Sequence, residues 1–289
     1  MSNRQVLALG QIQPVLGNVK ANLDKHLEWV EKARNEGATA VLFPELGLTG
    51  YHIQDLTLEV ARKRSDEEIQ SLVAASRDID VAFSFVEESD QHLYYIAAVY
   101  ASRGEIQSVH RKVYLPTYGM FDEGRYLARG SHFRSFSSSW GPCGMMICED
   151  AWHFTAPYLL SMGGAKLLIL MSSSPTRSLN QPDTFGSQAF WHRLLEVYAQ
   201  LFGVYIAFVN RIGFEDGVNF FGGSGVVAPD GTWLKEAPIL DETLITVTID
   251  DEAVRRIRYT VPLLRDERPD LLVQELKRLE RTSEGFEFR

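Results

Sequence analysis

The alternation of apolar and polar positions predicts two strand–helix units at the start of the chain. Residues 6–13 (VLALGQIQ) form an apolar run of strand length. Asn18 is placed to cap a helix that ends at Gly37. The apolar positions of this helix keep helical spacing and are Val19, Leu23, Leu27 and Val30. Residues 39–45 (TAVLFPE) give a second buried strand, and a polar helical stretch covers about 65–77.

The rest of the chain repeats this alternation and adds hairpins. Apolar strand patterns occur at 80–88, 94–102, 106–114, 143–149, 166–173, 204–210 and 244–250, and helical patterns at 151–163 and 184–203. Arg103-Gly104 is suited to a hairpin turn, and 223–237 reads as a hairpin turning at Asp230-Gly231. A short helix and a polar tail end the pattern. Mixed strand–helix units and hairpins in both halves predict an α/β protein with two helix-covered sheets in a single domain, 1–289.

Composition and charge exclude several classes of function. The net charge is −9, from 29 basic and 38 acidic side chains, which argues against a broad nucleic-acid-binding surface but leaves room for a small basic pocket. No segment has the roughly 18 consecutive apolar residues that a membrane span needs, and the N-terminus resembles a strand rather than a signal peptide. The two cysteines, Cys143 and Cys148, lie in one extended segment, too far apart for a disulfide, and so few cysteines favour a reducing cytoplasm.

Three segments place a reactive side chain where a buried strand meets a loop, a common position for catalytic groups. Glu45 ends one strand after a proline, Lys112 ends another, and Cys148 follows a third. Each also has a simpler interpretation: a surface carboxylate, a solvated cation on a strand edge, and a buried structural cysteine. We give Cys143 that structural interpretation, because it has no charged neighbour in the sequence.

Cys148 also precedes a helix-like stretch, which is the arrangement of a nucleophile elbow. A thiol at a helix N-terminus is expected to have a lowered pKa because of the helix dipole. Backbone N–H groups that follow such a residue can donate to an oxyanion.

In the order Glu, Lys, Cys, these segments resemble the nitrilase superfamily of carbon–nitrogen hydrolases. FPELGLTGY (43–51), RKVYLPTYGMFDEGRY (111–126) and ICEDAWH (147–153) are most similar to the glutamine-hydrolysing domain of glutamine-dependent NAD synthetases. The resemblance extends over nearly the whole chain, through the SSSP segment to the RDERP tail. One feature departs from it: we find no Gly-rich phosphate loop such as SGGxDS, so the ATP-using synthetase reaction is not expected from these 289 residues.

The resemblance implies a four-layer α-β-β-α sandwich and covalent catalysis without a metal or cofactor. The seven histidines show no metal-ligand spacing. By this resemblance, Cys148 is the nucleophile and Glu45 is its general base and acid. Lys112 and the backbone N–H of Glu149 stabilise the oxyanion, and Glu123 orients the lysine.

The same resemblance implies residues that contact the substrate. Tyr118 and Glu149 match positions that contact glutamine, although Tyr118 could also anchor a loop and Glu149 could merely adjoin the nucleophile. Ser173 and Arg177, in SSSPTR, are candidates for binding a substrate carboxylate or α-amino group. We expect the tryptophans at 152 and 191 to pack in the interior rather than to contact substrate.

The expected activity is therefore hydrolysis of a small linear amide, glutamine-like, to an acid and ammonia. A nitrilase or an N-carbamoyl hydrolase with the same three residues is the alternative among enzymes. A catalytically silent scaffold is a further alternative, against which the intact Glu45, Lys112 and Cys148 argue. The family pattern also predicts a homodimer or higher homo-oligomer, formed through helices beside the site and a tail from about residue 262. The partners expected are a small-molecule amide and an ammonia-accepting synthetase, with no nucleic acid and no membrane.

Overall fold

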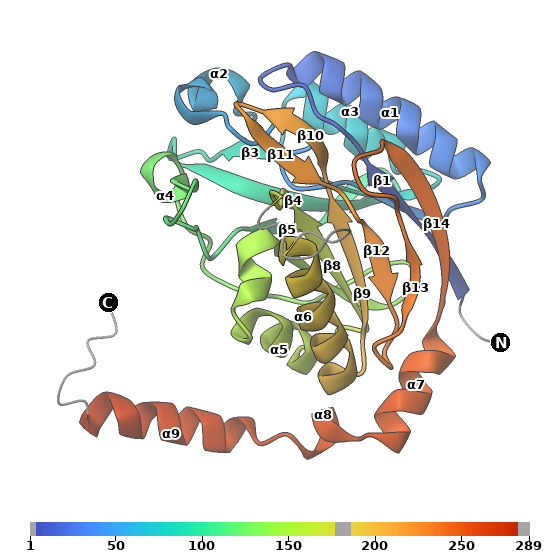
Figure 1. Ribbon diagram of the computed structural model, residues 1–289, viewed down its shortest axis with the longest axis vertical. Coiled ribbons are helices and arrows are strands. Elements are labelled where there is room, and N and C mark those ends of the chain that lie inside the picture. Colours follow the sequence, from blue (N-terminus) through green and yellow to red (C-terminus); the bar gives the residue numbers. More distant parts are fainter. Residues whose placement is uncertain (1–3, 177–185, 283–289) are drawn as a thin grey trace.

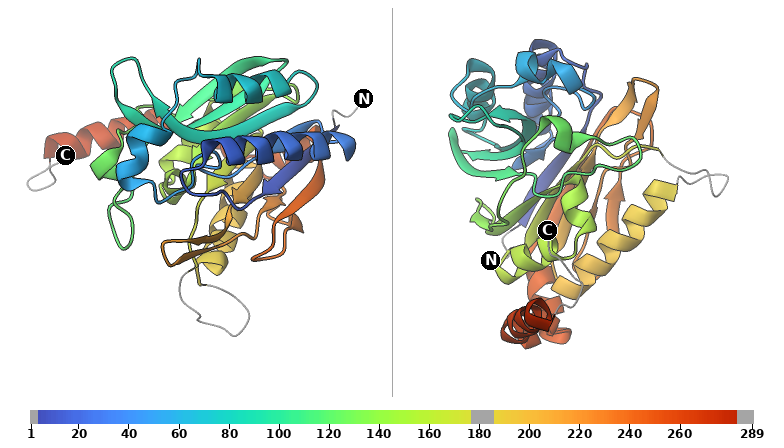
Figure 2. Two further views of the ribbon diagram at one scale, coloured as in Figure 1. Left: turned by 90° about the horizontal axis from the view of Figure 1, so that it is seen from above. Right: turned by 90° about the vertical axis from the view of Figure 1, so that its left-hand side faces the viewer.

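The computed structural model describes residues 4–176 and 186–282, and its body is a four-layer sandwich. Two six-stranded sheets pack against each other. Helices α1 (Val19–Asn35) and α3 (Glu67–Ala75) cover the outer face of the first sheet, and α5 (Thr155–Met162) and α6 (Gly186–Phe202) cover the second (Figures 1 and 2). The predicted α-β-β-α architecture is confirmed.

The first sheet has the strand order β14-β1-β2-β3-β4-β5. Its strands are β1 (Arg4–Gln11), β2 (Ala40–Leu42), β3 (Asp80–Glu88), β4 (Tyr94–Ser102), β5 (Glu105–Arg111) and β14 (Thr243–Asp250). The central strands β1, β2 and β3 are parallel, so crossover segments containing α1 and α3 connect them. Asn18 caps α1 by accepting a hydrogen bond from the backbone N–H of Ala21, as the sequence predicted. Arg103 and Gly104 both have positive φ, which a two-residue β4–β5 turn requires.

The second sheet has the order β13-β12-β9-β8-β7-β6. Its strands are β6 (Phe136–Ser137), β7 (Pro142–Ile147), β8 (Leu167–Ser172), β9 (Tyr205–Asn210), β12 (Gly225–Val227) and β13 (Trp233–Glu236). The parallel strands β7, β8 and β9 are almost wholly buried because a sheet covers one face and helices the other. The predicted helix over 151–163 is divided, with a short 3₁₀ turn at Cys148–Trp152 and α5 after it.

A separate two-stranded hairpin, formed by β10 (Ile212–Glu215) and β11 (Val218–Phe221), was not predicted from the sequence. Asp216 and Gly217 form its turn, and both have positive φ. An Asp-Gly pair between two strand segments is a hairpin signal that the sequence analysis overlooked. The remaining short helices are 3₁₀ helix Gln54–Leu56, α2 (Thr57–Val60) and α4 (Glu123–Tyr126).

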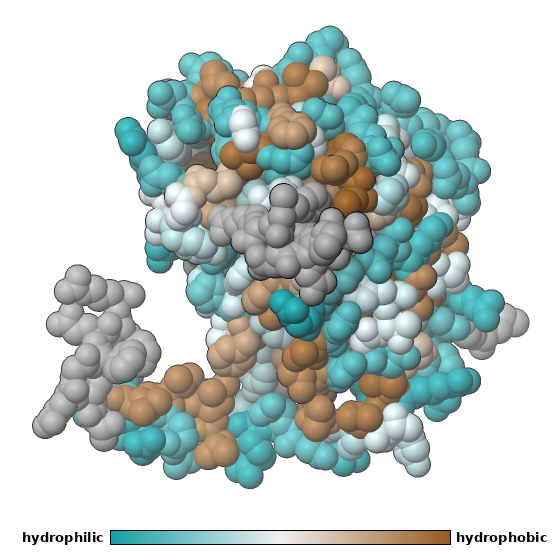
Figure 3. Space-filling view, in the orientation of Figure 1, coloured by the Kyte–Doolittle hydropathy of each residue, from teal (hydrophilic) through white to brown (hydrophobic). Residues whose placement is uncertain are grey.

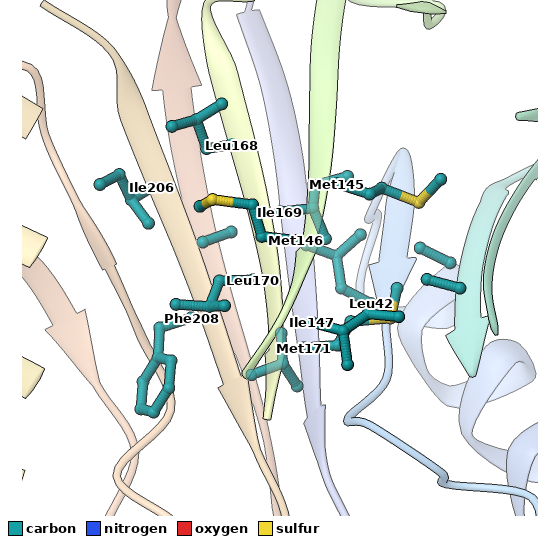
Figure 4. Packing of buried hydrophobic residues seen from close by; sticks show 14 of the residues in the cluster. Leu42, Met145, Met146, Ile147, Leu168, Ile169, Leu170, Met171, Ile206 and Phe208 are labelled. Carbon is teal, nitrogen blue, oxygen red and sulfur yellow. The ribbon is translucent and has the colours of Figure 1, made fainter. Parts of the chain in front are cut away.

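The interior between the two sheets is apolar along most of its length. Leu42 of β2 belongs to the same buried cluster as Met145 and Ile147 of β7 and Leu170 of β8 (Figure 4). A second cluster fills the space between the first sheet and helices α1 and α3. Both cysteines are buried and free, as their spacing predicted.

The C-terminal part of the chain leaves the sandwich. Helices α7 (Asp251–Thr260), α8 (Leu263–Asp266) and α9 (Pro269–Thr282) follow β14, and α9 extends beside the body rather than joining a layer (Figure 1). The predicted polar tail thus contains a helix, with Leu271, Val273, Leu276 and Leu279 between 45% and 49% exposed. Within the described residues, no helix is both long and apolar enough to cross a bilayer.

Candidate active site

Glu45, Lys112 and Cys148 come together from the ends of strands in both sheets. Lys112 directly follows β5, Glu45 follows β2, and Cys148 directly follows β7 of the second sheet. The Lys112 Nζ atom lies 2.8 Å from Glu45 Oε1, and both charges act on the Cys148 thiol. The three residues that the sequence analysis singled out are therefore neighbours in space.

Lys112 is an almost completely buried cation between two carboxylates. Its ammonium donates to Glu45 Oε1 at 2.8 Å and to Glu123 Oε1 at 2.7 Å, and its side chain is 1% exposed. Burial alone would lower the pKa of Lys112, but the charges of Glu123 and Glu45 outweigh it and hold the pKa well above its usual value. Lys112 is therefore a fixed positive charge.

Glu123 is held from two sides through one oxygen. Its Oε1 atom accepts hydrogen bonds from Lys112 and from the hydroxyl of Tyr51. Burial raises the pKa of Glu123 to about 7, an effect opposed by Lys112 and reinforced by the charge of Glu45. The carboxyl therefore changes its charge near neutral pH.

Glu45 is held by Lys112 on one oxygen and by the SSSP segment on the other. The backbone N–H of Ser173 donates to Glu45 Oε2 at 2.8 Å, and the Ser173 hydroxyl donates to the Glu45 carbonyl oxygen at 2.9 Å. Ser173 is completely buried and does not line the cavity beside Cys148. A contact with substrate, as suggested from the sequence, would require it to face that cavity. Arg177, the other residue suggested from this segment, lies outside the described residues.

Cys148 begins a tight turn in a left-handed backbone conformation, with φ of 41°. Such a conformation is strained for a residue with a side chain and is common at functional sites. Burial raises the pKa of the Cys148 thiol, and so does the charge of Glu45, while Lys112 and a hydrogen bond from Ser172 act in the opposite direction. The prediction of a thiol pKa lowered by a helix N-terminus was wrong, because Cys148 begins a five-residue 3₁₀ turn and its burial dominates.

Asp150 connects the strand that carries Lys112 with the strand that carries Cys148. One carboxylate oxygen accepts from the backbone N–H groups of Val113 and Tyr114, each at 3.0 Å. The other accepts from the N–H of Ile147 at 3.0 Å and lies 2.8 Å from His110 Nε2. Asp150 thus fixes the distance between the two strand ends.

The sequence analysis assigned no role to Asp150 or to Tyr51. Both residues lie inside the quoted motifs that contain Cys148 and Glu45, so their proximity to those candidates was an available signal.

A cavity of about 240 Å³ opens beside the Cys148 thiol. Its lining comprises Tyr118, Phe121, Cys148, Glu149, Trp152, Ser174, Pro175, Gly186, Ser187 and Phe190. The Tyr118 hydroxyl donates to Glu149 at 2.9 Å, and burial raises the pKa of Glu149. Trp152 stacks on Phe190 with ring centroids 4.1 Å apart, but it is 40% exposed and lines the cavity, so the expectation that it packs in the interior was wrong. Trp191, in contrast, is buried as expected.

No cluster of three or more His, Cys, Asp or Glu side chains in the described parts of the chain is arranged to hold a metal ion. The reactive groups that meet at the site are one thiol, one ammonium and the carboxyl groups beside them.

Comparison with known proteins decides the family. The family model described as carbon-nitrogen hydrolase matches residues 6–259, which is most of the chain. The chain belongs to this family. The nitrilase-superfamily membership that the three motifs predicted is thereby confirmed.

Relatives of this carbon-nitrogen hydrolase include both longer proteins and proteins of its own length. The glutamine-dependent NAD(+) synthetase of Thermotoga maritima is 34% identical over 255 residues, which cover 86% of this chain but only 43% of that protein. A carbon-nitrogen hydrolase from Helicobacter pylori G27 is 26% identical, with a TM-score of 0.85 and coverage of 95% and 99% of the two chains.

An amidase from Nesterenkonia sp. AN1 shares the fold, with a TM-score of 0.79 over 93% of the hydrolase and 96% of the amidase, at 24% identity. In that structure the active site cysteine carries the acetamide moiety of fluoroacetamide.

Proposed function

We propose that this carbon-nitrogen hydrolase is a thiol amidohydrolase that cleaves a small, linear, glutamine-like amide to an acid and ammonia. The observation that carries the proposal is the arrangement of Glu45. Its carboxylate is completely buried, held by Lys112 and Ser173, and close enough to Cys148 to raise the pKa of the thiol. A carboxylate fixed beside a thiol, at the edge of a small cavity, is suited to transfer protons in an acyl-transfer reaction.

The first half of the reaction forms a thioester. The S–H bond of Cys148 breaks, its proton passes to Glu45, and the sulfur attacks the amide carbonyl carbon. The C=O π electrons move to the oxygen, where Lys112 and the backbone N–H of Glu149 stabilise the negative charge. An ammonium has three protons, and two of those of Lys112 are donated to Glu45 and Glu123, which leaves one for the oxyanion. The C–N bond then breaks, and Glu45 returns its proton to the departing ammonia.

The second half releases the acid. Glu45, again a carboxylate, takes a proton from water, and the resulting hydroxide attacks the thioester carbonyl. The C–S bond breaks, and Glu45 protonates the departing sulfur. One carboxyl group thus serves both as base and as acid, and the proposed reaction steps use no metal or cofactor. Glu123 contributes by holding Lys112 in place.

The cavity supports a substrate with a positively charged end. Glu149 is the charged side chain among its described lining residues, and the aromatic rings of Tyr118 and Trp152 lie around the same space. A carboxylate near aromatic faces suits an ammonium group. We assign Tyr118 and Glu149 to the α-amino group of the substrate and keep Arg177 as the candidate for its carboxylate. The contacts of Ser173 favour a role in positioning Glu45 rather than in binding substrate.

The alternatives within the same chemistry differ in the substrate. A nitrile or an N-carbamoyl group also presents an electrophilic carbon to a thiol, and the residues that attack it would be the same. A catalytically silent scaffold would have no need for three charged side chains buried around a thiol, because buried charges destabilise a fold unless they are paired.

Ammonia release by the purified protein tests the proposal. L-Glutamine is compared with aliphatic amides, carbamoyl compounds and nitriles, and Cys148→Ala is the blank. We expect release from glutamine-like amides and none from the Cys148→Ala protein. Release only from nitriles or carbamoyl compounds would replace the substrate class. No release from any compound, with an unreactive Cys148, would favour the scaffold.

The exposed apolar face of the C-terminal helix supports the proposal of a homo-oligomer. Leucine and valine side chains of α9 are half exposed, and so are Leu159 of α5 and Val197 and Leu201 of α6 on the body. Figure 3 shows apolar surface along the C-terminal helix and on the neighbouring lower part of the body. A 14-residue helix is marginally stable in water without tertiary contacts. We therefore propose that a second copy of the chain covers α9. If the chain also supplies ammonia to a synthetase, that partner is a separate protein or a separate segment.

A further inference from the structure

We propose that Ser172 is a catalytic residue whose hydroxyl donates a hydrogen bond to the Cys148 sulfur and stabilises its thiolate form. The inference rests on the proposed role of Cys148 as nucleophile. It adds a group to the site that the Glu45, Lys112 and Cys148 pattern does not contain.

The contact is made by the two strands themselves. Ser172 Oγ lies 3.4 Å from Cys148 Sγ, within the range for a hydrogen bond to sulfur, and Ser172 is completely buried. Strands β7 and β8 are parallel neighbours in which Ile147 pairs with Met171. Cys148 directly follows β7 and Ser172 is the last residue of β8, so the register of the two strands places the hydroxyl beside the thiol.

The backbone of Ser172 is held in place by its pairing in β8 and by the chain that follows β9. Ser172 pairs with Asn210 in the register of β8 and β9, and its carbonyl oxygen accepts a hydrogen bond from the N–H of Arg211 at 3.2 Å. A hydroxyl on so fixed a backbone loses little additional conformational entropy when it binds the sulfur.

The charges around the sulfur give this hydrogen bond its importance. Two carboxyl groups, Glu45 and Glu123, and one ammonium, Lys112, interact with the thiol. Burial and both carboxyl groups disfavour a negative sulfur, so Lys112 and Ser172 are the groups that favour it. A hydroxyl donates more strongly to a thiolate than to a neutral thiol, because the charged acceptor strengthens the bond.

Ser172 keeps its own proton during the reaction. The thiol proton goes to Glu45, and the negative charge left on sulfur receives the hydrogen bond from Ser172. When the S–C bond forms, the sulfur loses its charge and the hydrogen bond weakens. The hydroxyl therefore favours the thiolate before each attack and after each thioester cleavage, and it does not compete for the oxyanion.

The pH dependence of thiol alkylation tests the inference directly. The folded protein is treated with iodoacetamide from pH 6 to pH 10, and mass spectrometry follows the peptides containing Cys148 and Cys143 separately. For Ser172→Ala we expect the midpoint of Cys148 alkylation to move up by about one pH unit, with alkylation below the midpoint roughly tenfold slower. Ser172→Gly, which also lacks the hydroxyl, gives the same readout if the alanine variant does not fold.

A matched control separates the hydroxyl from packing. Ser161 of α5 is buried, its hydroxyl has no partner among the described residues, and Ser161→Ala is expected to leave the Cys148 profile unchanged. A Ser172→Ala protein whose Cys148 is alkylated as fast as that of the wild type at every pH would overturn the inference. Alkylation remains informative if no tested amide is hydrolysed. If Cys148 is reactive and its alkylation depends on Ser172, the inference stands and only the proposed substrate is wrong. If Cys148 of the wild-type protein reacts as slowly as Cys143, both the inference and the proposed nucleophile are wrong.

Discussion

The hydroxyl of Tyr51 donates a hydrogen bond to Glu123 on the same oxygen that accepts from Lys112. Tyr51 lies in the loop after β2, and its backbone N–H in turn donates to Glu215 of the β10–β11 hairpin at 2.9 Å. The position of the Lys112 ammonium therefore depends on a chain of contacts that begins in a hairpin outside both large sheets.

Activity is expected to rise with pH through about 7. The pKa of Glu123 is raised to about 7, so the carboxyl is mostly neutral at pH 6 and mostly ionised at pH 8. A neutral Glu123 holds the Lys112 ammonium less firmly. The hydrogen bond from Tyr51 lowers the pKa of Glu123, so Tyr51→Phe should shift the acid limb of kcat/KM to higher pH. Tyr100→Phe, which removes a buried hydrogen bond to Asp80 elsewhere, is the control. A profile that is flat from pH 5.5 to pH 8.5 would contradict this prediction.

Asp150→Asn is expected to lower both stability and activity. The four groups that face the carboxylate are donors, and an asparagine NH₂ group must oppose two of them. We expect a loss of about 3 kcal/mol in the free energy of unfolding, measured by urea denaturation. The kcat of the remaining folded protein should fall, because Lys112 and Cys148 are no longer held at a fixed separation. Asp24→Asn, on the exposed face of α1, should change neither quantity. An Asp150→Asn protein as stable as the wild type would argue against a role of Asp150 in holding the two strand ends together.

Glu149→Gln is expected to discriminate between charged and neutral amides. If Glu149 binds the ammonium of the substrate, its replacement should raise KM for L-glutamine roughly tenfold, equivalent to the loss of about 1.4 kcal/mol. The KM for propionamide, which has no ammonium, should stay close to the wild-type value. Steady-state ammonia assays with both compounds measure this difference. Equal increases in KM for L-glutamine and propionamide would indicate that Glu149 shapes the cavity and does not bind the ammonium of the substrate.

Leu276→Glu is expected to dissociate the proposed oligomer. Leu276 is 49% exposed on α9, and a carboxylate there would be buried without a partner if a second copy covers this face. Native mass spectrometry should then show a 32.7 kDa species in place of the larger one. Gln274→Glu introduces the same charge at a polar position of the same helix and should leave the oligomer intact. A wild-type protein that is itself monomeric would refute the proposal.

Local sequence signals predicted most of the architecture. Asn18 and Gly37 bound α1 because caps are determined by nearby residues, and the apolar runs of β3, β4 and β8 are long enough to be unambiguous. The polar tail was a weaker prediction. Apolar residues of α9 are spread among charged ones, and only the helical conformation collects them on one side.

The candidate site was predictable only as far as motifs contain it. Glu45, Lys112 and Cys148 lie in recognisable segments, but the partnership of Cys148 with Ser172 arises from the register of β7 and β8. Register is set by the pairing of segments that are distant in the sequence, so it cannot be predicted from either segment alone. The thiol pKa was predicted in the wrong direction for the same reason, since burial of Cys148 depends on the whole fold.

The separate origin of the proposed base, Glu45, and the proposed nucleophile, Cys148, has a consequence for the newly made protein. Glu45 and Lys112 belong to the first sheet and Cys148 to the second, so neither half of the chain contains a working centre. A chain in which only one sheet has formed would carry a cysteine without its base or a base without its cysteine. Such a protein would lack the proposed centre until both halves have closed on each other, so the proposed hydrolysis would report directly that folding is complete.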